Sequence, residues 1–367
     1  MGGAFREFLS HQTNLTNLDL SSNNLFGVFP TWLFINNSKL KLLYLLNNSL
    51  SGSLQFPHFT NLSLENLDVS NNNFHGQIKD LGYIDLSNNN FSGELPRKLI
   101  SDCKSLDKLV LSNNNLEGDI IPEDMNLPRL RWMKLNNNRF GGTINEALRK
   151  SFRLFYLDIS NNNVTGQLPW WIGNFFYLDT LSVSQNKLNG QIPKEICAVG
   201  HYYLDLSRNN FSGTIPSCSN SCQFFYMQLH NNLIGEIPDS LSNCSRLQTL
   251  DLRDNHISGS IPLWIGKLSS LIVLLLGGNN IHGTIPKQLC KLRSINILDL
   301  SRNNLYGEIP KCFNNISFGM KTLMDFEYAY YVYHGNDGYY LERYNVLEEV
   351  EFLAKNQYLS YVGFGFI

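Results

Sequence analysis

A short pattern of alternating hydrophobic and polar residues recurs along most of the chain. The segment LDLSSNNLFGVFP at 18–30 returns as LDVSNNNFHGQI, LDISNNNVTGQLP, LDLRDNHISGSIP and LDLSRNNLYGEIP. Leucines at every second position predict short strands with one buried face. The Asn that closes LxLxxN recurs thirteen times, mostly 23 to 25 residues apart, at Asn23, Asn48, Asn72, Asn89, Asn114, Asn138, Asn162, Asn186, Asn209, Asn232, Asn255, Asn279 and Asn303. This period predicts thirteen stacked coils.

Each position of the repeat has a physical task. The leucines fill the interior, and the amide of the repeated Asn can satisfy backbone groups of a bend that no sheet pairs. Gly four residues later permits a tight turn, and Pro then fixes an extended stretch. We therefore predict an α/β-type leucine-rich-repeat solenoid over residues 12–317, after a leading segment at 1–11. It should have a curved parallel sheet on its concave face and irregular or short helical convex arcs.

Two stretches depart from the period. Asn72 and Asn89 are only 17 residues apart, so about seven residues of convex arc are missing, and we expect a kink or a flattened outer wall there. Residues 318–367 lack the repeat, contain nine of the 17 tyrosines, and have seven Asp or Glu against three Lys or Arg. We interpret them as an acidic, Tyr-rich tail in which YAYYVY could pair as a strand.

Composition and motifs exclude several functional classes. The net charge of -2 provides no field that would attract nucleic acid. HExxH, GxSxG and kinase signatures are absent, so we expect neither an enzyme nor a cofactor. No CxxC pair occurs, which argues against a metal site. The sequence contains no apolar run of about 18 to 20 residues and opens without a signal-peptide pattern.

The segments LNGQIP at 188–193, ISGSIP at 257–262 and LYGEIP at 305–310 give the repeats a second signature. They resemble the plant-type leucine-rich repeats of receptor-like kinases, receptor-like proteins and polygalacturonase inhibitors. The tail after IPKCFNNISFGM resembles the start of the non-repeat island of receptor-like proteins. Those proteins carry a signal peptide, a Cys-bearing cap, further repeats and a membrane helix. Because these features are missing here, we expect a partial receptor-like protein, truncated at the island.

This resemblance implies a non-enzymatic ectodomain that binds an extracellular peptide or protein at the plant cell surface, in defence or developmental signalling. In the family, signalling depends on a partner receptor kinase, and the full-length protein lies in the plasma membrane. Two alternatives stay open. One is a truncated or decayed product without activity, which the short coil and the missing ends favour. The other is a soluble inhibitor of cell-wall-degrading glycosidases, which the tail disfavours.

The outward strand positions are the ones that a ligand would contact. The repeat favours Asp, Ser and Asn there, and departures cluster in coils six to eleven. Exposed aromatic and Arg side chains are typical of protein interfaces. The predicted concave ligand-binding residues are Trp132, Lys134, Tyr156, Tyr203, Arg208, Tyr226, His230 and Arg253. The four aromatic residues share one column that Thr180 interrupts, and we expect Arg208 and Arg253 to hold a carboxylate.

The cysteines and the N-x-[ST] sequons complete the candidate chemistry. We expect most of the seven cysteines to be free structural thiols, although Cys218 and Cys222 in PSCSNSC are close enough to bridge a short loop. Glycosylation is expected at several sequons if the chain is secreted. The sequons are Asn14, Asn36, Asn47, Asn61, Asn90, Asn163, Asn210, Asn243 and Asn315.

Overall fold

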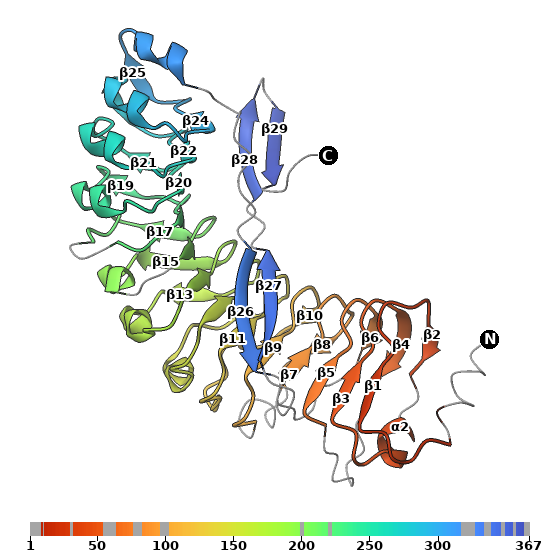
Figure 1. Ribbon diagram of the computed structural model, residues 1–367. Coiled ribbons are helices and arrows are strands. Elements are labelled where there is room, and N and C mark those ends of the chain that lie inside the picture. Colours follow the sequence, from red (N-terminus) through yellow and green to blue (C-terminus); the bar gives the residue numbers. More distant parts are fainter. Residues whose placement is uncertain are drawn as a thin grey trace.

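The solenoid forms an arc of stacked coils (Figure 1). The computed structural model describes residues 9, 11–29, 32–53, 64–75, 83–95, 103–198, 202–218, 222–316, 327–333, 339–345, 349–354 and 357–362. Each coil contributes one three-residue strand to the concave face, and we number the coils 1 to 13 by these strands. They are β1 (Asn17–Asp19), β3 (Leu42–Tyr44), β5 (Asn66–Asp68), β7 (Tyr83–Asp85), β9 (Lys108–Val110), β11 (Trp132–Lys134), β12 (Tyr156–Asp158), β14 (Thr180–Ser182), β16 (Tyr203–Asp205), β18 (Tyr226–Gln228), β20 (Thr249–Asp251), β22 (Val273–Leu275) and β24 (Ile297–Asp299).

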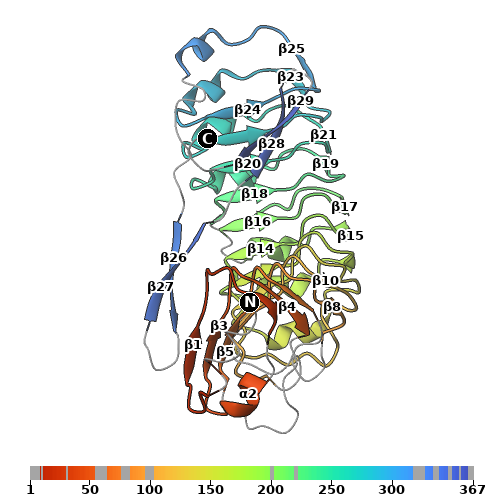
Figure 2. The same ribbon diagram turned by 90° about the vertical axis from the view of Figure 1, so that its right-hand side faces the viewer.

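These strands form one 13-stranded parallel sheet in sequence order, seen as successive rungs in Figure 2. The central residue of each strand points into the core, so that Leu43 pairs with Leu67 in the register and both are fully buried. The first and third residues point outward onto the concave face, as the alternating pattern requires. The predicted fold class and the thirteen coils are confirmed.

Short strands and single helical turns make up the convex side. The second strands are β2 (Phe26–Val28), β4 (Ser49–Ser53), β6 (Asn73–His75), β8 (Ser92–Gly93), β10 (Asn115–Leu116), β13 (Thr165–Gln167), β15 (Lys187–Gln191), β17 (Asn210–Ser212), β19 (Ile234–Gly235), β21 (His256–Ile257), β23 (His282–Thr284) and β25 (Asn304–Tyr306). The helical turns are α2 (Trp32–Asn36), η1 (Glu146–Lys150), η2 (Trp170–Asn174), η3 (Lys194–Ala198), η4 (Asp239–Asn243), η5 (Leu263–Lys267), η6 (Lys287–Lys291) and η7 (Lys311–Asn315). Pro169 and Pro262 directly precede η2 and η5, where the fixed φ of proline suits a helix start.

A ladder of buried Asn side chains joins neighbouring coils at the bend after each concave strand. The amide nitrogen of Asn186 donates to the backbone oxygens of Ile159, Val183 and Ser184 at 3.0 to 3.1 Å. Its amide oxygen accepts a hydrogen bond from the backbone N–H of Val164 at 2.9 Å. One side chain therefore satisfies four backbone groups from two coils, as the repeat pattern predicts.

Coil 10 differs from the predicted ladder. Counting LxLxxN from the strand predicts Asn232, but the buried ladder residue is Asn231, and Asn232 is exposed. The Asn231 amide donates to the backbone oxygen of Leu206 at 3.0 Å and accepts from the backbone N–H of Asn209 at 2.9 Å. The bend of this coil is one residue shorter, so the ladder position moves back by one.

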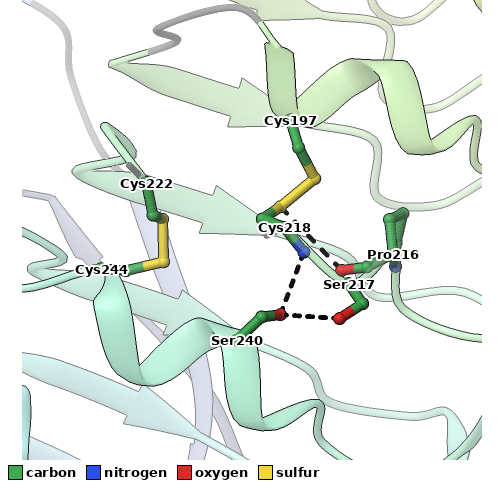
Figure 3. The surroundings of a disulfide bond; sticks show 7 residues. All are labelled: Cys197, Pro216, Ser217, Cys218, Cys222, Ser240 and Cys244. Atoms are coloured by element: carbon green, nitrogen blue, oxygen red, sulfur yellow. Dashed lines mark hydrogen bonds between the residues drawn. A yellow bond between two sulfur atoms is a disulfide. The ribbon is translucent and has the colours of Figure 1, made fainter. Parts of the chain in front are cut away.

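Three disulfides brace the convex side, which corrects the expectation of free thiols. The pairs are Cys197–Cys218, Cys222–Cys244 and Cys290–Cys312, and each joins residues one coil apart. The alternative bridge between Cys218 and Cys222 is also wrong. Figure 3 shows the first two pairs close together, with the Ser240 hydroxyl accepting from the backbone N–H of Cys218 at 3.0 Å. Cys103 is buried and takes part in none of these three disulfides.

The two predicted irregular stretches are only partly described. The concave sheet crosses the short coil in register, with Asn66 opposite Tyr83, but the convex arc at 76–82, where we expect a kink or flattening, lies outside the described residues. In the tail the pairing changes from parallel to antiparallel. β26 (Glu327–Tyr333) pairs with β27 (Tyr339–Asn345), and β28 (Glu349–Ala354) pairs with β29 (Gln357–Val362). The segment YAYYVY, which the sequence allows to pair as a strand, lies within β26.

Candidate functional site

A groove runs along the concave face from coil 4 to coil 11 and has a volume of about 660 Å³. Seven of the eight predicted ligand-binding residues line it, from Trp132 on β11 to Arg253 beyond β20. Tyr226 is the exception. Asp85 on β7 and Lys108 on β9 extend the groove two coils beyond the predicted region. At about 4.8 Å per strand, eight coils span roughly 34 Å, which matches about ten residues of extended peptide.

The predicted aromatic column exists, and Thr180 interrupts it. The register places Trp132 opposite Tyr156, Tyr156 opposite Thr180, and Tyr203 opposite Tyr226. The Trp132 and Tyr156 rings stack with centroids 4.7 Å apart and an interplanar angle of 17°. The Tyr203 and Tyr226 rings are tilted, with centroids 5.9 Å apart.

The expectation that all four rings are exposed is wrong. Trp132 is only 6% exposed and Tyr226 only 5%. Trp132 packs against Phe155 and Tyr156, and the Tyr226 hydroxyl donates to Gln248 Oε1 at 3.4 Å. The half-buried rings of Tyr156 and Tyr203 therefore offer the aromatic surface of the groove.

Carboxylates at the third position of the concave strands form a feature that the sequence reasoning set aside as repeat consensus. Asp85, Asp158, Asp205 and Asp251 all line the groove. One oxygen of each accepts the backbone N–H two residues later, as Asp158 does from Ser160 at 3.0 Å. Burial raises the pKa of Asp158 and Asp205 above the usual value. These carboxylates fix the bend and also place acceptors along the groove.

The predicted clamp for a carboxylate needs a correction. Arg253 is already paired with Asp251, through Nε at 3.0 Å and Nη2 at 2.7 Å. Its charge is therefore compensated within the chain, and the structure does not support a paired clamp with Arg208. Arg208 itself is exposed and lines the groove, as does the half-buried Lys134.

His230 lies at the C-terminal end of the groove beside Asp254, with Nε2 3.5 Å from the carboxylate. Arg302 contacts the other oxygen of Asp254 at 2.8 Å. Burial lowers the pKa of His230, although Asp251 and Asp254 oppose this shift. The described lining of the groove ends at coil 11, and at coil 12 the outward side chains of Val273 and Leu275 are fully buried in a small apolar cluster.

Within the described ranges no group of three or more His, Cys, Asp or Glu side chains is arranged to hold a metal ion. No helix found there has the length and apolar character needed to span a bilayer. Seven of the nine sequon asparagines are exposed, namely Asn14, Asn36, Asn47, Asn90, Asn163, Asn210 and Asn243. Asn61 lies outside the described residues, and for Asn315 only the backbone is described, as the end of η7.

Known proteins share both the repeat and the arc. Leucine-rich-repeat family models match residues 245–305 and five further segments, at 14–34, 63–82, 80–101, 153–175 and 202–222. Receptor-like protein 13 of Arabidopsis thaliana is 38% identical over 159 residues, which is 35% of this chain and 15% of that protein. The plant peptide hormone receptor RGFR1, solved in complex with RGF2, has a TM-score of 0.75 and 31% identity over 82% of this chain and 49% of its own.

In sequence and in fold the chain is similar to plant leucine-rich-repeat receptor-like proteins and receptor ectodomains. The Arabidopsis receptor kinase HAESA, solved with the peptide hormone IDA and the co-receptor SERK1, has a TM-score of 0.68 and 30% identity, covering 84% of this chain and 62% of its own. The match to receptor-like protein 13 spans only 15% of that relative's length.

Proposed function

We propose that this part of the receptor-like protein binds an extracellular peptide or a peptide segment of a protein along its concave groove, without catalysis. The observation that carries the proposal is the row of groove residues that depart from the repeat, above all Tyr156, Tyr203, Arg208 and His230. Scaffold positions explain the Asp and Ser side chains of the groove, but they do not require aromatic or cationic ones. Half-buried rings beside charged groups suit an extended peptide.

The related structures support this use of the fold. The RGFR1 structure contains RGF2, and the HAESA structure contains a peptide hormone and a co-receptor. By analogy, we infer that the full receptor-like protein acts at the cell surface with a partner receptor kinase. The three disulfides fit an oxidising, extracellular compartment. The exposed sequons fit glycosylation there.

Selection from a random peptide library on the full chain tests the proposal. We expect enrichment of peptides that bind the wild-type chain at least tenfold more tightly than the Tyr156→Ala/Tyr203→Ala variant, because central aromatic anchors contribute most of an interface's free energy. Lys194→Ala, on the convex turn η3, is the matched control and should leave the affinity unchanged. If the affinity of the selected peptides falls with Lys194→Ala but not with Tyr156→Ala/Tyr203→Ala, the binding site lies outside the groove.

A further inference from the structure

A second surface of interest lies beside the groove, on the side of the solenoid from which the chain enters each concave strand. We call the two positions that precede a concave strand by four and three residues the leading flank. In coils 6, 7 and 8 these positions hold Pro128 and Arg129, Phe152 and Arg153, and Phe176 and Tyr177. The strands that follow pair in register, so the three pairs of residues lie on adjacent coils about 4.8 Å apart.

Three aromatic side chains of this flank are largely exposed. Phe152 is 56% exposed, Tyr177 67% and Phe176 83%, which together presents on the order of 400 Å² of aromatic surface. Their neighbours Leu154 and Phe175 already fill the core, so the exposed rings are not needed for packing. Contiguous exposed apolar surface of this size on a soluble domain often marks an interaction site.

The charged residues at the described leading-flank positions are all basic. Among the residues that the structure describes, no leading-flank position in any coil holds Asp or Glu. Six exposed cations occupy these positions: Lys39, Lys104, Arg129, Arg153, Arg246 and Arg293. The guanidinium of Arg153 lies 5.9 Å from the centre of the Phe152 ring, which joins the cationic and aromatic surfaces. Because the whole chain has a net charge of -2, this basic strip is a local feature.

Three of the sequons lie beyond the concave strand of their coil, whereas the leading flank comes before it. Asn90, Asn163 and Asn210 each come directly after a ladder Asn, beyond the concave strand, and all three are exposed. The segments 126–131, 150–155 and 174–179, which lead into strands β11, β12 and β14, contain no N-x-[ST]. Glycans attached at the sequons of coils 7 and 9 would therefore leave the leading flank of coils 6 to 8 accessible.

We propose that the leading flank of coils 6 to 8 binds a second protein whose surface presents carboxylates around an apolar socket. Arg, Phe and Tyr are typical of the centre of protein interfaces, and the basic strip selects an acidic partner. A polyanionic polysaccharide would satisfy the cations but would leave the exposed phenylalanine rings without apolar contacts. Phe176 and Tyr177 do not line the groove, so a groove ligand and this partner can bind at the same time.

Site-specific photocrosslinking in the full chain, secreted from plant cells, tests this surface. The photoreactive residue p-benzoylphenylalanine replaces Phe176, and a control chain carries it at Leu263, which is 67% exposed on the convex turn η5. We expect at least tenfold more protein adduct from position 176. The crosslinked peptide of the partner should have a net negative charge. Adding Arg129→Glu and Arg153→Glu should reduce the adduct at least tenfold while the thermal unfolding midpoint is unchanged.

Several results would overturn the proposal. Equal adduct yields at positions 176 and 263 would mean that crosslinking at position 176 is non-specific. An adduct that survives the charge reversal, or one formed with a second copy of this chain, would contradict an acidic partner. Retention on a polygalacturonate gel without a protein adduct would assign the strip to a polysaccharide. The Tyr156→Ala/Tyr203→Ala variant should give the same adduct yield as the wild-type chain. The experiment therefore tests the leading flank independently of peptide binding in the groove.

Discussion

The guanidinium of Arg253 donates two hydrogen bonds to Asp251, two residues earlier on the concave face, at 3.0 and 2.7 Å. The side chains of this pair are only 12% and 8% exposed. The ion pair therefore lies in the wall of the groove and is well shielded from water. Because Arg253 is already paired with Asp251, its charge is not available to a ligand in the groove. We therefore assign the pair a role in stabilising the folded chain.

Removal of this cation should destabilise the solenoid. Arg253→Ala leaves Asp251 buried without its partner, and we expect the free energy of unfolding to fall by about 3 kcal/mol. Arg302→Ala is the matched control, because Arg302 also pairs with a carboxylate but its side chain is 50% exposed. Exposed pairs contribute less than about 1 kcal/mol. Urea denaturation followed by tryptophan fluorescence measures both, and equal losses would contradict the account.

Replacing a single Asn of the ladder should lower the free energy of unfolding substantially. Asn186→Ala leaves four backbone groups of two coils without a partner, so we expect a loss of roughly 3 kcal/mol or more. Asn189→Ala, three residues later and exposed, should cost less than about 0.5 kcal/mol. The same denaturation experiment compares the two variants. A large effect at Asn189, or none at Asn186, would count against the ladder.

The disulfides predict a thiol count. Titration of the denatured chain without reductant should find one thiol, that of Cys103, and full reduction should release seven. Cys103→Ser should lower the first count to zero. Each bridge closes a loop of about 22 residues and is worth about 3 kcal/mol in a chain-entropy estimate. Reduction should therefore lower the unfolding midpoint, and seven thiols before reduction would refute the pairing.

Two neighbouring carboxylates on the concave face, Asp68 and Asp85, predict that the stability of the folded chain depends on pH. Burial, with Asp85 nearby, raises the pKa of Asp68 from 3.8 to about 6. The folded chain therefore binds this proton more tightly than the unfolded chain. The resulting stabilisation is present below about pH 4 and is lost as the pH rises to about 6.

Asp68→Asn should remove this component of the pH dependence, which is on the order of 2 to 3 kcal/mol. The amide oxygen can still accept the hydrogen bond from the backbone N–H of Ser70. Asp19→Asn is the control, because Asp19 is exposed and makes the same contact to Ser21. Unfolding free energies measured from pH 4 to 7 give the comparison. A wild-type chain and an Asp68→Asn variant with parallel pH profiles would disprove the assignment.

Much of the fold could be predicted because the repeat encodes it locally. The LxLxxN pattern sets the strand, the bend and the ladder, so thirteen coils and their outward columns follow from the sequence. The exposure of Trp132 could not be predicted, because it depends on Phe155 and Tyr156 of the next coil. The shift to Asn231 arises from one missing residue in a bend, which strand-based counting does not detect.

The disulfides left a signal that the sequence reasoning did not use. Their cysteines are 21 or 22 residues apart, which is close to one coil, so equivalent positions on adjacent coils face each other. The groove carboxylates were also overlooked, because Asp is the consensus residue of the repeat. Their second role appears only when the strands are stacked and the carboxylates of coils 4, 7, 9 and 11 line one groove.

Amide hydrogen exchange of the full chain, with and without a library-selected peptide, tests the central claim most directly. We expect slower exchange in the concave strands of coils 6 to 11, including 156–158 and 203–205, where an extended peptide would cover the sheet. The convex turns at 194–198 and 263–267 should exchange at the same rate with and without peptide. Protection of these convex turns, with unchanged exchange in the concave strands, would contradict a groove-binding receptor ectodomain.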